Sequence, residues 1–180
     1  MPNMVEVVID SIRVSLMSQQ RVVILREMNS DRYLPIMVGI YEAEHLTLAL
    51  QDVEVSRPLT YDLFVNILDT LNAEVTHIEV VSLKDETYFG NIVLSINGTL
   101  HNIDSRPSDA MNLAIRMQVP IFVADEVLEE AGRTGRRSQP VLQYAHSFSA
   151  LRKDPVLGSV GAQFTAKQSS VFEDCAQNRA

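Results

Sequence analysis

Hydrophobic and polar positions alternate with a period of two over the first part of the chain, which indicates strands. Val5, Val7 and Ile9 alternate with their neighbours in a strand expected to reach Val14, and residues 22–25 form a continuous apolar run typical of a buried strand. Residues 33–36 are a third strand, placed at an edge or near its own end by Pro35. We therefore predict three strands joined by turns at residues 18–20 and 29–31.

After Gly39 the apolar residues follow the spacing of a helix. Ala43, Leu46, Leu50 and Val53 fall on one face. A second helix is expected to follow the Arg-Pro segment at residues 57–62, and its predicted buried face comprises Leu63, Ile67, Leu68 and Leu71.

The strand and helix pattern then recurs with a period near 70 residues. Strands are expected over 75–83, 88–96 and 99–104, and Asn97-Gly98 is a strong hairpin turn signal. A helix follows with Ala110, Leu113, Ala114 and Met117 inside, then a strand over 119–123 and a short helix capped by Asp125. We predict an α+β fold over residues 1–132: a compact mixed sheet from two β-β-β-α repeats, with helices packed on the sheet. The alternative is that similar hairpin and helix patterns arose without duplication.

The polar, basic residues beyond Gly132 indicate a change in organisation. Residues 133–180 are predicted to be a C-terminal tail, either mobile or an accessory to a partner. Residues 1–130 carry 20 acidic and 8 basic side chains, a net charge of −12, whereas residues 131–180 carry a net charge of +4. An acidic body repels a phosphate backbone, so any nucleic-acid role requires a local site, bound metal ions or the basic tail.

The composition favours a cytoplasmic protein. The chain has no apolar run of the roughly 20 residues that span a bilayer, and its N-terminus lacks the pattern of a secretory signal. Its single cysteine, Cys175, excludes a disulfide framework and a zinc site built from cysteines.

Two similar corners carry the candidate chemistry: Arg57-Pro58-Leu59-Thr60-Tyr61-Asp62 and Arg106-Pro107-Ser108-Asp109. Proline suits the first turn of a helix, Thr60 or Ser108 is expected to cap it, and the aspartates suit its positive end. The arginines oppose the helix dipole unless they hold an anion. We expect the two corners to face each other across the pseudo-symmetry of the repeats.

The candidate residues form three groups. Asp104, Arg106 and Asp109 lie at one junction between strand and helix, and Arg57, Thr60 and Asp62 lie at the other corner. Glu42 and Glu44 open the first helix. Carboxylates placed in this way can converge on Mg²⁺ or Mn²⁺, with Asp104 and Asp109 as ligands and Arg57 or Arg106 stabilising phosphoryl oxygens. The alternative is an Arg–Asp network that braces the starts of the helices.

The sequence also resembles a known family over about residues 4–131. The matching blocks lie at residues 32–39, 42–43, 57–62, 87–90, 103–110 and 119–123. They are similar to the bifunctional nuclease family of bacteria and plants. The resemblance implies a compact α+β domain that forms homo-oligomers and hydrolyses phosphodiester bonds in DNA and RNA. The two corners fall on the shared motifs, and Glu42 lies near them.

The resemblance leads to two hypotheses. In the first, the chain is a metal-assisted nuclease of low sequence specificity, with Asp62, Asp104, Asp109, Arg57 and Arg106 as catalytic residues and Thr60, Ser108 and Glu42 as substrate-binding residues. In the second, it is a binding or regulatory domain whose corners are structural or bind a small anion. The family usually has histidine where this chain has Tyr61, and tyrosine, with a pKa near 10, is a poor general base at neutral pH and at best a hydrogen-bond donor.

Overall fold

The computed structural model describes residues 3–14 and 20–134, so residues 18 and 19 of the predicted turn and nearly all of the predicted tail lie outside it. The described residues form one eight-stranded sheet and four helices. The strands are β1 (Met4–Val14), β2 (Arg21–Glu27), β3 (Arg32–Val38), β4 (Ala73–Lys84), β5 (Thr87–Ile96), β6 (Thr99–Ser105), β7 (Ile121–Ala124) and β8 (Arg133–Thr134). The helices are α1 (Ile40–Leu50), α2 (Thr60–Thr70), α3 (Pro107–Met117) and α4 (Asp125–Ala131).

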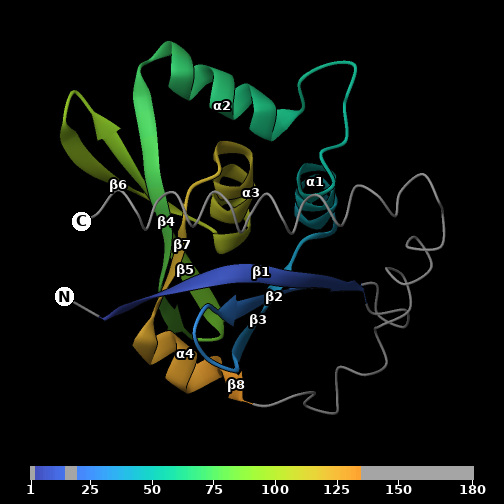
Figure 1. Ribbon diagram of the computed structural model, residues 1–180, viewed down its shortest axis with the longest axis vertical. Coiled ribbons are helices and arrows are strands. Elements are labelled where there is room, and N and C mark those ends of the chain that lie inside the picture. The colour runs from blue at the N-terminus through green and yellow to red at the C-terminus, as the bar shows by residue number, and fades with distance from the viewer. Residues whose placement is uncertain (1–2, 15–19, 135–180) are drawn as a thin grey trace. The chain divides into compact units, whose positions relative to one another are not determined.

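The sheet confirms the predicted α+β fold. Its strand order is β6-β5-β4-β7-β1-β2-β3-β8, in which β1-β2-β3 and β4-β5-β6 are antiparallel meanders (Figure 1). Between the meanders lies β7, which is parallel to β4 and antiparallel to β1. The two residues of β8 extend the sheet beyond the predicted domain boundary at residue 132, because they pair with β3.

The repeat relates α1 to α3, which corrects the expected relation between the two corners. The first meander is followed directly by α1 and the second directly by α3, whereas α2 is an additional helix between the repeats. The residue that precedes α1 is Gly39 and the residue that precedes α3 is Arg106. Gly39, and not Arg57, is therefore the counterpart of Arg106.

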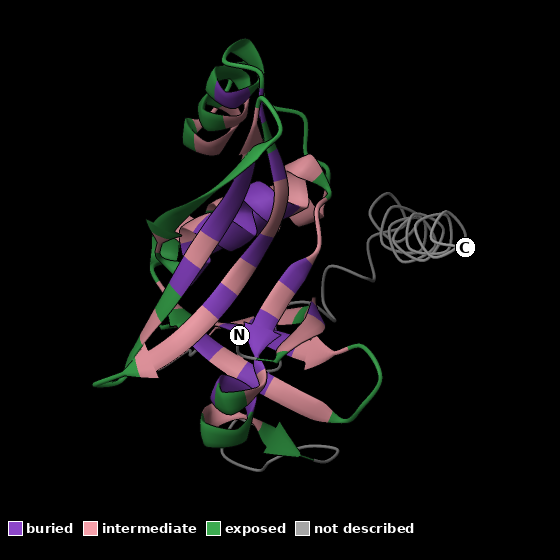
Figure 2. Ribbon diagram, turned by 90° about the vertical axis from the view of Figure 1, so that its left-hand side faces the viewer, coloured by how far each residue is buried: buried purple, intermediate pink, exposed green. Residues whose placement is uncertain are grey.

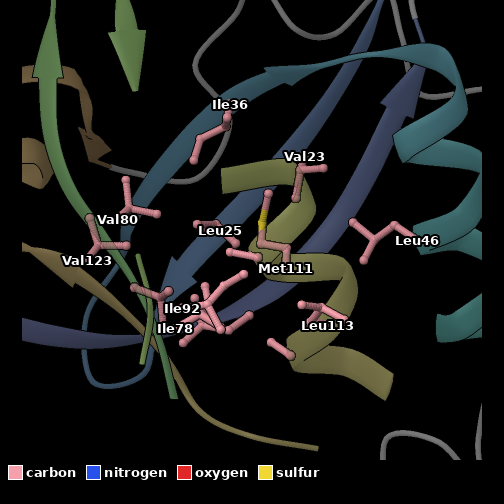
Figure 3. Close-up of a cluster of buried hydrophobic side chains, with 14 of the residues drawn as sticks. Val23, Leu25, Ile36, Leu46, Ile78, Val80, Ile92, Met111, Leu113 and Val123 are labelled. Atoms are coloured by element: carbon pink, nitrogen blue, oxygen red, sulfur yellow. The ribbon is translucent and has the colours of Figure 1, made fainter. Parts of the chain in front are cut away.

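The core lies between the sheet and the helices, and α3 is at its centre. Met111 of α3 is fully buried among side chains from both meanders, including Leu25 and Ile78 (Figure 3). Ala110, Leu113 and Ala114 are buried as predicted. Gly90 of β5 lies beneath the start of α3, where a Cβ would lie 3.4 Å from the Cα of Pro107 and 3.1 and 3.2 Å from backbone oxygens of the two neighbouring strands.

The predicted buried face of α2 is largely wrong. Leu68 is buried, but Leu63, Ile67 and Leu71 are exposed, as is Phe64. Figure 2 shows that this helix, at the top of the view, is mostly exposed. The helical spacing of apolar residues correctly places these side chains on one face of α2. The rest of the described chain packs against Leu68 and leaves the other three exposed.

Thr60, Ser108 and Asp125 are not the N-caps that the sequence predicted, although Asp62 accepts a hydrogen bond from the Leu59 backbone N–H at the start of α2. The N-caps of α2, α3 and α4 are Leu59, Arg106 and Ala124, none of which makes a side-chain cap hydrogen bond. Asp125 lies one residue further along and pairs with Arg32 at 2.8 Å. Among the described residues, no helix is long and apolar enough to cross a membrane.

Candidate functional site

The first turns of α1, α2 and α3 meet at one place and bring three acidic residues with them. Glu42, Asp62 and Asp109 each occupy the third position of their helix, where a carboxylate complements the positive end of the helix dipole. Side chains from the first turns of all three helices are in contact. The site therefore joins the two repeats and the helix between them.

Arg106 is the centre of this arrangement. Its Nε donates to Asp109 Oδ2 at 2.6 Å, and its Nη2 donates to Asp109 Oδ1 at 2.9 Å, which makes a bidentate pair. The same Nη2 lies 2.8 Å from Glu42 Oε1. The Arg106 side chain is nevertheless 66% exposed, so two carboxylates hold a guanidinium that still faces solvent.

Tyr61 of α2 completes the contacts of Asp109. Its hydroxyl donates to Asp109 Oδ1 at 2.6 Å. Burial raises the pKa of Tyr61 above its usual value, and the hydrogen bond to Asp109 raises it further. Tyr61 therefore keeps its proton near neutral pH and acts as the hydrogen-bond donor that its residue type predicted.

Arg116, in the last turn of α3, connects the three helices behind this site. Its Nε donates to Asp62 Oδ1 at 2.8 Å, its Nη2 donates to the backbone oxygen of His45 at 3.2 Å, and its guanidinium carbon lies 5.3 Å from the centroid of the Tyr61 ring. The Arg116 side chain is only 10% exposed. Sequence reasoning did not single it out, because a basic residue in the last turn of a helix usually complements the dipole.

Asp62 and Asn112 belong to the same structural network. Burial raises the pKa of Asp62, but hydrogen bonds from Arg116 and from the Leu59 backbone N–H outweigh it, so the net pKa lies below its usual value. Asn112 is fully buried, accepts from Arg116 Nη1 at 3.0 Å and donates to the backbone oxygen of Glu42 at 3.0 Å. Asp62 thus braces α2, as in the structural alternative considered for the corners.

The side chains of the other candidate residues make no hydrogen bond or ion pair with Arg106, Asp109 or Glu42 in the described part of the chain. Arg57 and Thr60 are exposed, and their side chains make no hydrogen bond or ion pair with the described part of the chain. Ser108 is buried beside Asp109. Their roles stay predictions.

Asp104 projects from the sheet face opposite α3. Its neighbour Ile103 pairs with Ile92, whose side chain lies in the core beneath α3 (Figure 3), and side chains alternate between the two faces of a strand. Asp104 and Asp109, the two predicted metal ligands, therefore point to different sides of the sheet.

The donor set also does not fit a divalent ion as it stands. Within residues 3–14 and 20–134, no three His, Cys, Asp or Glu side chains are grouped so as to hold a metal. Both oxygens of Asp109 already accept hydrogen bonds from Arg106, and Glu42 shares that arginine. An ion bound by Glu42 and Asp109 would have to displace Arg106.

Gly39 controls the position of Glu42, which leads to a prediction. The Glu42 carboxylate folds back over Gly39, so a Cβ there would overlap it. We expect Gly39→Ala to displace the Glu42 carboxylate from Arg106 and so to remove one exposed ion pair. Stability should change by less than about 1 kcal/mol, because the backbone at Gly39 is extended and suits alanine.

A double-mutant cycle with Glu42→Gln checks this prediction. If Gly39→Ala acts by moving Glu42, the double variant should have the same free energy of unfolding in urea as Glu42→Gln alone. Additive losses would show that the new methyl group acts in another way.

Comparison with known proteins identifies the class of domain that carries this site. The bifunctional nuclease domain matches residues 23–135, and the chain belongs to that family. An uncharacterized protein of Mycobacterium tuberculosis is 39% identical over 127 residues, which cover 71% of this chain and 76% of the relative. Bifunctional nuclease 2 of Arabidopsis thaliana is 33% identical over 105 residues, which cover 57% of this chain and 32% of the plant protein.

Proposed function

We propose that this chain hydrolyses phosphodiester bonds in DNA and RNA with low sequence specificity, and that Arg106 holds the phosphate. The observation that carries the proposal is an arginine that is fixed by two carboxylates and yet faces solvent. Exposed ion pairs contribute little to folding stability, so stability alone does not account for this arrangement. Membership of the bifunctional nuclease family supports the reaction type.

The residues of the site have distinct roles in this proposal. Arg106 binds a phosphate oxygen and stabilises the charge that develops as the bond to the leaving group breaks. Asp109 and Glu42 set the orientation of its guanidinium. Tyr61 offers a hydroxyl that can turn from Asp109 to a phosphate oxygen.

A second candidate function is anion binding without catalysis. The observation that favours it is that Arg106 engages both Glu42 and Asp109, so neither carboxylate is free to accept a proton from water. The acidic composition of residues 1–130 favours it too. In this case the site would bind a phosphate group of a ligand and leave it intact.

Cleavage assays distinguish the two functions. The whole chain is incubated with single-stranded and duplex DNA and RNA, with Mg²⁺, with Mn²⁺ and with a chelator. The proposal expects cleavage of both nucleic acids that is lost in Asp109→Asn, and the predicted metal assistance expects loss with the chelator. Phosphate binding without any cleavage would favour the second function, and full activity in Asp109→Asn would point to a contaminating nuclease.

The same assay tests the residues that lie apart from the cluster. Asp104→Asn and Arg57→Met each remove a predicted catalytic side chain that makes no contact with Arg106. Loss of activity in either variant would extend the site to that residue. Full activity would limit the site to the first turns of α1, α2 and α3.

We also propose homo-oligomeric assembly. It is supported by the exposed apolar stripe of α2, because contiguous apolar surface often marks an interface. Sedimentation velocity of the whole chain tests it, and a monomer at all concentrations would contradict it.

A further inference from the structure

The corner between β3 and α1 exposes three apolar side chains, Met37, Ile40 and Tyr41. We call these residues the β3–α1 corner. Tyr41 is 76% exposed although it belongs to a well-formed helix, because Ala43 and Leu46 occupy the face of α1 that meets the core. Packing within the described domain therefore does not account for an aromatic residue at this position.

This corner adjoins the Arg106 cluster. Tyr41 precedes Glu42, whose carboxylate lies 2.8 Å from Arg106 Nη2. An exposed aromatic ring thus leaves α1 one residue before the side chain that contacts an exposed guanidinium, and the two α1 side chains point about 100° apart around the helix. This is the combination that single-stranded nucleic acids use, in which a ring stacks on a base and a cation holds the backbone.

The net charge of residues 1–130 determines how much of the affinity for nucleic acid the Tyr41 ring has to supply. Proteins that bind nucleic acids without stacking gain most of their affinity by neutralising many phosphates. Residues 1–130, which carry 8 basic against 20 acidic side chains, offer few cations for this. One phosphate contact at Arg106 is weak alone, whereas stacking of one base on an aromatic ring adds about 1–3 kcal/mol.

We propose that Tyr41 stacks on a base next to the phosphate held by Arg106, and that the ligand of this site is therefore single-stranded nucleic acid. The proposal rests on the proposed function, because it uses the same arginine. A duplex keeps its base faces stacked on each other and cannot offer one to Tyr41 without unstacking. Single strands, loops and frayed ends then bind more tightly than duplex of the same length.

Binding of a labelled single-stranded oligothymidylate with phosphorothioate linkages, which resist hydrolysis, tests the proposal by fluorescence anisotropy. We expect Tyr41→Ala to weaken binding about 5- to 100-fold and Tyr41→Phe to keep it within about twofold, because phenylalanine retains the ring. Phe64→Ala removes an aromatic side chain of α2 that is 52% exposed, and it should leave binding unchanged.

An abasic oligonucleotide of the same length separates stacking from phosphate binding. It has no base to stack, so wild type and Tyr41→Ala should bind it with equal affinity, whereas Arg106→Met should weaken binding of both oligonucleotides. A Tyr41 effect that persists on the abasic ligand, or no Tyr41 effect at all, would overturn the stacking proposal. An Arg106 variant with full affinity would instead overturn the proposed phosphate site.

Sedimentation velocity of Tyr41→Ala provides one further check. The stacking proposal expects the same oligomeric state as the wild type. Dissociation of an oligomer by this single substitution would show that the β3–α1 corner is an interface between copies of the chain, and would overturn the proposal.

Discussion

Arg106→Met is expected to reduce nucleic-acid cleavage about 100- to 1000-fold, the usual cost of removing one donor that stabilises charge in a transition state. The stability of the fold should change by less than about 1 kcal/mol, because the Arg106 side chain is mostly exposed. Initial rates under matched conditions and unfolding in urea measure the two effects on the same preparation.

The combination of a large loss in rate and a small loss in stability is what identifies a site. Arg26→Met is a suitable control, since Arg26 forms an ion pair with Asp10 on the sheet and lies outside the three helix starts. It should retain full activity. Equal activity of Arg106→Met and the wild type would contradict the proposed role. A loss of several kcal/mol in the free energy of unfolding would show that Arg106 is a structural residue.

Arg116→Met, unlike Arg106→Met, should act mainly on stability. We expect it to destabilise the fold by about 2–4 kcal/mol. It removes a nearly buried guanidinium and leaves Asp62 and Asn112 without their partner. Denaturant unfolding monitored by circular dichroism measures the change. Arg106→Met is the matched comparison, because both arginines flank the same helix and differ mainly in exposure.

The contribution of Asp62 also predicts how stability depends on pH. Its pKa is lower in the folded chain than in the unfolded one, so its stabilising effect is complete above the unfolded value, about 4. The effect is lost as the pH falls through the lower, folded value. The difference in stability between wild type and Asp62→Asn should therefore shrink below about pH 4, and a difference independent of pH would contradict this role.

Much of the fold could be predicted from the sequence because it depends on local periodicity. The alternation in β1, the Asn97-Gly98 turn and the recurring order of elements predicted both meanders and the α+β class. The exposure of α2 could not be predicted in this way. A helical period shows which residues share a face, as for Leu63 and Ile67, but not whether another element covers that face.

The site was predicted in part for a similar reason. Arg106 and Asp109 are three residues apart on one helix, so their contact follows from local geometry. Glu42 and Tyr61 join them only through the packing of three helices, and Arg116 forms its contacts across the same interface. Asp104 is close to Arg106 in sequence but on the other face of the sheet, a difference that the alternation along β6 determines.

The relation between α1 and α3 has a consequence for how this family can vary. Glu42 and Asp109 occupy the same position in the two repeats, and both depend on one arginine that has no counterpart in the first repeat, where Gly39 stands. A change at position 106 therefore leaves two carboxylates without a cation, one in each repeat. We expect substitutions at positions 39, 42, 106 and 109 to occur together across homologues. An alignment of the family should then show these four positions changing as a group and not one at a time.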